Sequence, residues 1–209
     1  MDGHPLETWR GKVDGSAAGP GPIWVRDFLK ERWPNARIFT WEYNTGRAFW
    51  DNCIASIWDI GEALLSRLED ERRRLPSQRP ILFICHSLGG IILKAALVKA
   101  REKNRYEWVS PIPKAVAFFG TPHKGSRLAD DLYWIAMMLP LASKRWPKLL
   151  KDRSEELEAL SDSFADRADE LVYIVSFFET MTTKPHRSPV TCLLYADPYH
   201  REFELTFCM

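Results

Sequence analysis

The chain has 209 residues, 45% of them hydrophobic, so we expect residues 1–209 to form one domain that buries about 70% of its unfolded surface. Its 29 basic and 28 acidic residues leave a formal net charge of +1, which excludes the strong overall field typical of a nucleic-acid-binding protein. No stretch approaches about eighteen apolar residues, and the N-terminus lacks the apolar core of a signal peptide, so the sequence predicts neither secretion nor a membrane span.

The first 22 residues have the composition of a loop. They contain five glycines and three prolines, which interrupt helices and strands alike. His4 lies in this segment. Because no strand precedes it, we expect His4 to be an ordinary loop residue and not part of a catalytic motif.

Helix and strand patterns begin after this loop. Residues 24 to 33 separate apolar from charged positions, as in a short amphipathic helix, and Pro34 ends the pattern. Residues 37 to 43 are rich in strand formers and predict a sheet strand. From Asp51 onward, apolar residues recur every three or four positions, which predicts a long amphipathic helix. Its charged end, residues 69 to 74, is expected to be a solvated face.

A strand, a tight turn and a second helix are predicted in the middle of the chain. The apolar run from Ile81 to Cys85 has the length of a buried strand and ends at small and polar residues. Gly89 and Gly90 then open an apolar helix. We expect Lys94 and Lys99 on the solvent-exposed side of this helix.

Ser87 lies at the turn between this strand and this helix, in the sequence C-H-S-L-G, a degraded form of the G-x-S-x-G nucleophile elbow. In such an elbow the serine hydroxyl is exposed on a strained turn. The amide of the next residue, here Leu88, faces the oxygen that becomes negative during acyl transfer. Gly89 is the small residue needed after the serine, whereas Cys85 replaces the usual first glycine. We expect His86 to be a packed or hydrogen-bonded turn residue, and Ser87 to be the nucleophile.

A second motif follows another predicted strand, residues 115 to 119. It has the sequence G-T-P-H-K-G-S, from Gly120 to Ser126, and begins about thirty residues after the serine. His123 in this motif is a candidate base. In α/β-hydrolases, however, the base comes last in the chain, after the acid. We therefore expect His123 to order the loop instead.

The pair H-S-L-G-G and G-T-P-H-K-G-S resembles the serine esterase branch of the lipase-like α/β-hydrolases. This branch includes the serine-active-site-containing proteins and the N-terminal hydrolase domains of many fungal NLR-type receptors. The resemblance extends through W-V-R-D-F-L, P-N-A-R-I, S-E-E-L-E and S-F-F-E-T and covers roughly residues 3 to 183. It implies the α/β-hydrolase fold, a mostly parallel sheet flanked by helices.

Within that fold, alternating apolar strands and amphipathic helices predict that residues 81–85 form the central strand, with residues 115–119 and 37–43 as its neighbours. The resemblance also implies an apolar strand ending in His-Gly before the first loop, whose backbone would supply the second oxyanion donor. This chain starts with M-D-G-H, after the point where that strand would stand. We therefore expect the first strand and half of the oxyanion hole to be missing.

Residues 128–150 are the least sheet-like part of the chain and the candidate for a helical lid. They combine methionines and tryptophans with basic residues, and Pro140 interrupts them. As a lid, the segment would suit a lipid substrate or peripheral contact with a membrane surface. Alternatively, it packs on the domain as an ordinary structural face. A helix capped by Ser154, with acidic residues in its first turn, is predicted to follow.

The predicted buried strand at residues 171–178 leads to the candidate acid, Glu179. In hydrolases the acid commonly projects from such a strand end, and Glu179 lies within the S-F-F-E-T similarity. A last strand is predicted at residues 188–195, which makes His200 the preferred base, with His186 as the alternative. Asp197 is the alternative acid. The tail, residues 184–209, matches the family poorly.

These observations predict a lipase-like serine hydrolase that cleaves carboxylic esters, including lipid esters, through an acyl-enzyme on Ser87. Neither a metal nor an organic cofactor is expected. The alternative is a hydrolase-fold module with little or no turnover, acting in intracellular signalling or in innate-immunity-type receptors. The intact H-S-L-G-G favours the enzyme, whereas the degraded elbow, the absent His-Gly loop and the unusual tail favour the module. The expected partner is a small-molecule or lipid ester; the oligomeric state is left open.

The four cysteines are far apart and form no C-x-x-C pair, so the sequence indicates a reduced, intracellular setting. The cytoplasm is the expected compartment. Association with the membrane of a mitochondrion or of the endoplasmic reticulum is the alternative.

Overall fold

The computed structural model describes residues 6, 9–11, 21–43, 53–74, 79–109, 113–123, 154–168, 171, 173–177 and 204–208. These residues form a five-stranded sheet whose order is β1-β5-β2-β3-β4. Every neighbouring pair in it is parallel. The strands are β1 (Arg37–Trp41), β2 (Ile81–His86), β3 (Pro113–Phe119), β4 (Tyr173–Phe177) and β5 (Glu204–Cys208).

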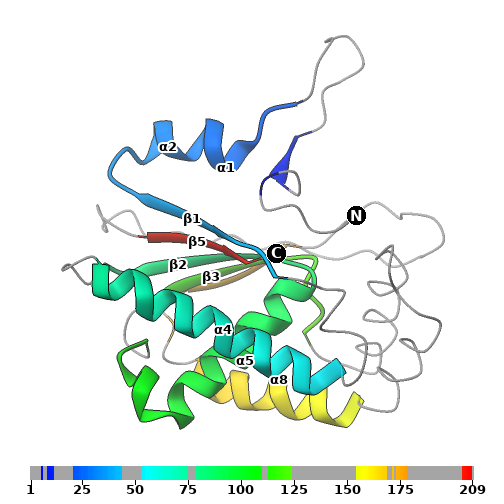
Figure 1. Cartoon of the computed structure of the whole chain (residues 1–209). Helices are drawn as coiled ribbons and strands as arrows, with labels where there is room; N and C mark the ends of the chain where they lie inside the picture. Colours follow the sequence, from blue (N-terminus) through cyan, green and yellow to red (C-terminus); the bar gives the residue numbers. More distant parts are fainter. Residues whose placement is uncertain are drawn as a thin grey trace, which may run out of the picture.

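Helices lie on both faces of the sheet (Figure 1). The short helices α1 (Trp24–Asp27) and α2 (Leu29–Arg32) lie on one face. Three longer helices, α4 (Cys53–Arg74), α5 (Leu88–Glu102) and α8 (Ser154–Ala168), lie on the other. The 3-10 helix η2 (Asn104–Val109) follows α5. A parallel sheet covered on both faces is the arrangement expected of α/β proteins, and it confirms the α/β class of the predicted fold.

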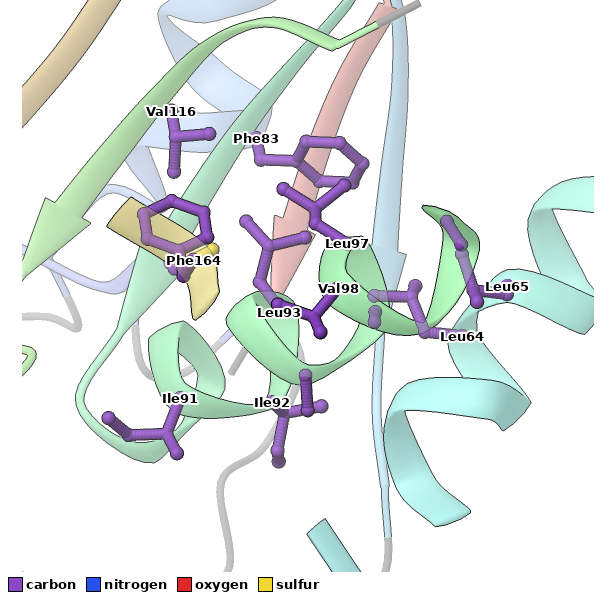
Figure 2. Packing of buried hydrophobic residues seen from close by; sticks show 14 of the residues in the cluster. Leu64, Leu65, Phe83, Ile91, Ile92, Leu93, Leu97, Val98, Val116 and Phe164 are labelled. Atoms are coloured by element: carbon purple, nitrogen blue, oxygen red, sulfur yellow. The ribbon is translucent and has the colours of Figure 1, made fainter. Parts of the chain in front are cut away.

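The alternation of side chains along β2 divides the core into two clusters. Ile81, Phe83 and Cys85 join the larger cluster with α4, α5 and α8, whereas Ile84 joins the smaller cluster beneath α1 and α2. Figure 2 shows the larger cluster, with Phe83 of the sheet close to α5. The sheet is thus buried on both faces, which explains the continuous apolar run from which β2 was predicted.

Most predicted elements are confirmed. The helix expected at residues 24–33 is present as α1 and α2, which meet at Phe28. The strand expected at residues 37–43 is β1, and the long helix that follows is α4. The later helix is α8, in which Ser154 is the first residue, and the strand expected at residues 171–178 is β4. The predicted burial of this strand is wrong, because β4 lies at the edge of the sheet and Ile174 is 40% exposed.

Of the two neighbours predicted for the central strand, one is confirmed and the other is wrong. Strand β2 pairs with β3, as predicted, but its other neighbour is β5 and not β1. Strand β1 lies one place further out and also pairs with β5. The sequence E-L-T-F-C of β5 contains strand-forming residues, but its position in the sheet is set by pairing with strands more than a hundred residues away.

The prediction that Lys94 and Lys99 lie on a solvent-exposed side of α5 is also wrong. Lys94 is 1% exposed, and the side chain of Lys99 is largely covered and pairs with Glu62 of α4. The reason is that α5 lies between the sheet, α4 and α8, so that 12 of its 15 residues are buried. A helix packed on several sides has little surface left for solvent.

Several predictions fall on residues outside the described ranges, among them His4, the lid candidate at 128–150 and the last strand at 188–195. Within the described part of the chain, no helix has both the length and the apolar character required to cross a membrane.

Candidate active site

Ser87 connects β2, which ends at His86, to α5, which begins at Leu88. Its backbone has φ 51° and ψ −121°, and it is the one residue other than glycine with positive φ in the described part of the chain. Such a conformation costs an L-residue about 1–3 kcal/mol and persists only where the surroundings enforce it. The strained strand-to-helix turn expected of a nucleophile elbow is therefore present at the predicted serine.

Hydrogen bonds restrain the backbone of Ser87 on both sides. Its N–H donates to the carbonyl oxygen of Phe119 at the end of β3, with an N–O distance of 2.8 Å. Its carbonyl oxygen accepts one hydrogen bond from the N–H of Gly90 at 3.1 Å and another from Oγ1 of Thr121 at 3.0 Å. Two residues at the end of β3 and just after it, Phe119 and Thr121, thus bond to the two ends of the Ser87 backbone unit.

The Ser87 side chain is not used for helix capping, although serine is a common cap and the residue stands at the capping position of α5. The residue is also partly exposed. Leu88 is the first residue of the 15-residue helix α5. Its amide is among those with no partner inside the helix, and it lies at the positive end of the helix dipole. These are the properties of a donor to a developing oxyanion.

The close approach that an elbow requires occurs at Gly90. A Cβ atom placed there would lie 2.3 Å from Oγ1 of Thr121 and 2.9 Å from the ring of Phe118. The sequence pattern predicts this role for Gly89, one residue earlier. Cys85, which replaces the usual first glycine, is completely buried in the larger core cluster. The turn therefore forms with a cysteine at that position.

His123 is anchored by its backbone and by its ring. Its carbonyl oxygen accepts a hydrogen bond from the Ser161 hydroxyl of α8 at 2.8 Å, and its Nε2 lies 3.0 Å from Oγ of Ser176 in β4. The edge of its ring also packs on Phe118. Burial, with a smaller contribution from the charge of Lys94, lowers the pKa of His123 to about 4. A neutral, anchored imidazole fits the expected loop-ordering role.

Lys94 is a buried cation near His123, and both residues contact Ser161. Its Nζ lies 3.4 Å from Oγ of Ser161 and 5.8 Å from the centre of the Phe164 ring. Because burial disfavours the charged amine, the pKa of Lys94 is lowered to about 8. The amine therefore remains mostly protonated at neutral pH, inside the core.

His86, beside the nucleophile, packs against the N-terminal segment. Its ring makes an edge contact with Trp9 at a centroid distance of 6.2 Å. Trp9 is itself buried and also contacts Trp24 and Phe119. His86 is the last residue of β2 and is exposed, so Trp9 covers only part of it and the predicted packed turn residue is not confirmed.

The structure brings Ser87, Leu88, Gly90 and Thr121 together at the carboxyl ends of β2 and β3. The predicted acid and base, Glu179 and His200, and their alternatives, Asp197 and His186, lie outside the described residues. In the part of the chain that is described, no cluster of three His, Cys, Asp or Glu side chains could bind a metal ion.

Thr121 is the site residue that sequence reasoning missed. Its signal was present: a β-branched hydroxyl residue directly follows the glycine at the end of β3, beside the strand that carries the serine. In the same motif His123 is the more obvious candidate, because histidine is a common catalytic base. A hydrogen bond from a side chain to the backbone of a residue 34 positions away could not be read from the sequence.

Comparison with known proteins identifies relatives named Protein SERAC1. Human SERAC1 is 29% identical over 192 residues, which are 87% of this chain and 29% of the relative. Mouse SERAC1 is 32% identical over 165 residues, 77% of this chain and 24% of the relative. Zebrafish (Danio rerio) SERAC1 is 26% identical over 195 residues. The chain thus spans less than a third of the length of these relatives, to which it is distantly related.

No protein-family model matches the chain, and no solved structure matches it.

Proposed function

We propose that this chain is a serine-hydrolase domain of the α/β-hydrolase type, in which Ser87 attacks the carbonyl carbon of a carboxylic ester. The observation that carries the proposal is the backbone of Ser87, strained at φ 51° between a buried parallel strand and the first residue of a helix. A serine without a catalytic role gains nothing from such a conformation, which a glycine would adopt at lower cost. The similarity to SERAC1 proteins supports the same class.

The reaction would proceed by acyl transfer. The Ser87 oxygen forms a bond to the carbonyl carbon while its proton passes to a base, and the alcohol then leaves with a proton returned by that base. Water hydrolyses the resulting acyl-enzyme to release the acid. The amide of Leu88 is the proposed donor to the oxyanion. His200 is the proposed base, with His186 as the alternative, and Glu179 is the proposed acid, with Asp197 as the alternative. Single substitutions at these four positions would show which base and which acid are used.

The proposed substrates are esters with an apolar acyl chain, including lipid esters. The support comes from the sequence of residues 128–150, where methionines and tryptophans adjoin basic side chains. As a lid, such a segment would accept an apolar chain and contact a membrane surface peripherally.

A fluorophosphonate probe tests the proposed nucleophile, because it forms a covalent bond with an activated serine. We expect the folded chain to be labelled once, and Ser87→Ala to abolish labelling. Ser163→Ala is the matched control, since Ser163 is an exposed serine of α8 and its loss should leave labelling unchanged. Labelling that survives in Ser87→Ala contradicts the assignment. A folded wild-type chain that takes no probe favours the alternative, a hydrolase-fold module with little turnover in a signalling or receptor protein.

A further inference from the structure

We infer that Thr121 is a positioning residue that keeps the Ser87 backbone in its strained conformation; its effect on reactivity rests on the function proposed above. The Thr121 hydroxyl donates to the Ser87 carbonyl oxygen at 3.0 Å. In this way a residue after β3 acts on the nucleophile through its backbone, without contact with a substrate being required.

The restraint acts at both ends of one residue. Phe119, two residues before Thr121, accepts the hydrogen bond from the Ser87 N–H at 2.8 Å. A short segment of chain thus bonds to the amide on one side of the Ser87 Cα atom and to the carbonyl on the other. Rotation of Ser87 toward an unstrained φ would move these two groups relative to each other and break at least one of the bonds.

Thr121 is itself held in place by packing. It is 1% exposed, and its side chain fills the space beside Gly90, where a Cβ atom would approach its Cγ2 to 2.5 Å. A rotated Thr121 side chain would therefore meet close neighbours. The hydroxyl is directed at the Ser87 carbonyl, with which it forms its hydrogen bond.

The turn that carries Thr121 is anchored at two further points. On one side, the N–H of Gly120 donates to the carbonyl oxygen of Phe177 at 2.8 Å. On the other, His123 bonds to Ser161 and lies within hydrogen-bond distance of Ser176. Thr121 therefore transmits the position of β4 and α8 to the elbow. This gives the T and the H of the G-T-P-H motif distinct positioning roles.

Two substitutions of Thr121 separate its hydroxyl from its shape. Thr121→Val keeps the branched shape but loses the hydroxyl, whereas Thr121→Ser keeps the hydroxyl but loses a methyl group. We expect Thr121→Val to lower the second-order rate of fluorophosphonate labelling at Ser87 about tenfold, equivalent to about 1.4 kcal/mol. Thr121→Ser should stay within about threefold of the wild type on the same scale. The opposite order, with Ser slow and Val unchanged, would show that Thr121 acts by packing alone and would overturn the inference.

Folding is checked for each variant by circular dichroism and by its midpoint in urea. Should Thr121→Val not fold, Thr121→Ala is compared with Thr121→Ser, because these two differ only in the hydroxyl group. Ser reacting faster than Ala supports positioning, and equal rates overturn it.

A readout independent of activity separates this inference from the proposed function. Amide hydrogen exchange, followed residue by residue by NMR, should be faster at Ser87 and Gly90 in Thr121→Val, and unchanged at Leu97 in the middle of α5. If the wild type takes no probe, the proposed function fails, while the exchange comparison still tests the role of Thr121. Unchanged exchange at Ser87 and Gly90 would refute that role.

Discussion

At the scale of single residues, the site depends on groups that are buried at some cost. Lys94 is buried and His123 is partly buried, and both contact Ser161 of α8 near the segment that contacts Ser87. Burial favours the neutral form of both side chains, which lowers both pKa values. Each group therefore makes the stability of the fold depend on pH, in a range set by its folded and unfolded pKa values.

We expect the chain to lose stability as the pH falls from about 6.5 to about 4, the range between the ordinary pKa of a histidine and that of His123. In this range the unfolded chain binds a proton at His123 and the folded chain does not, so protonation favours unfolding. The free energy of unfolding, measured in urea, should be up to about 2 kcal/mol lower at pH 5 than at pH 7 on account of this residue.

His123→Gln is the control, because glutamine keeps a polar group near Ser176 but does not titrate. Its loss of stability between pH 7 and pH 5 should be smaller than that of the wild type. Equal losses would assign the effect to other groups. By the same reasoning, Lys94 adds stability as the pH rises above about 8, since the folded chain then releases its proton before the unfolded chain does.

At the scale of secondary structure, the elbow depends on helix α5 being packed tightly against its neighbours. Gly61 of α4 lies against the backbone of α5, where a Cβ atom would come within 2.9 Å of the Ala96 nitrogen. That contact is with backbone and cannot be relieved by rotating a side chain. The spacing of α4 and α5 therefore requires a residue without a side chain at position 61.

We predict that Gly61→Ala destabilises the fold by about 1–3 kcal/mol, because the added methyl group separates the two helices. The sign of this change in stability is informative. Alanine is the better helix former by about 1 kcal/mol, so Gly61→Ala would stabilise an isolated α4. Asp59→Ala, at an exposed position of the same helix, is the control and should change stability by less than about 0.5 kcal/mol. A Gly61→Ala chain more stable than the wild type would contradict the packing described here.

At the scale of the whole molecule, the sheet joins the two ends of the chain. Strand β5, near the C-terminus, lies between β1 and β2 and pairs with both. Thr206 stands opposite Phe39 on one side and Phe83 on the other. The strand that precedes Ser87 therefore depends on residues more than a hundred positions later in the chain for one of its two ladders.

We expect Thr206→Pro to destabilise the chain by about 3 kcal/mol or more, because proline removes a ladder N–H from the interior of a sheet. Thr206→Val keeps the backbone N–H and the branched side chain and should be close to the wild type. Urea unfolding followed by circular dichroism compares the three proteins. Similar midpoints for the proline variant and the wild type would show that β5 does not occupy an interior place.

Local pattern in the sequence was sufficient for the type and approximate bounds of most elements and for the position of the strained turn at Ser87. The apolar run of β2, the small residues of the turn and the apolar helix after it are contiguous, so the strained turn could be located without knowledge of its surroundings. The anchoring of His123 was likewise anticipated from the order of residues in hydrolases, which argued against its use as the base.

The tertiary structure decided what depends on partners distant in sequence. The place of β5 between β1 and β2, the burial of Lys94 between α5 and α8, and the hydrogen bond from Thr121 to Ser87 all join segments at least thirty positions apart. Periodicity reports which face of an element is apolar, but not how many neighbours will cover it or which strand will pair with it. Because those choices are made by packing the whole core at once, the serine could be named from the sequence, whereas the residues that hold it in position could not.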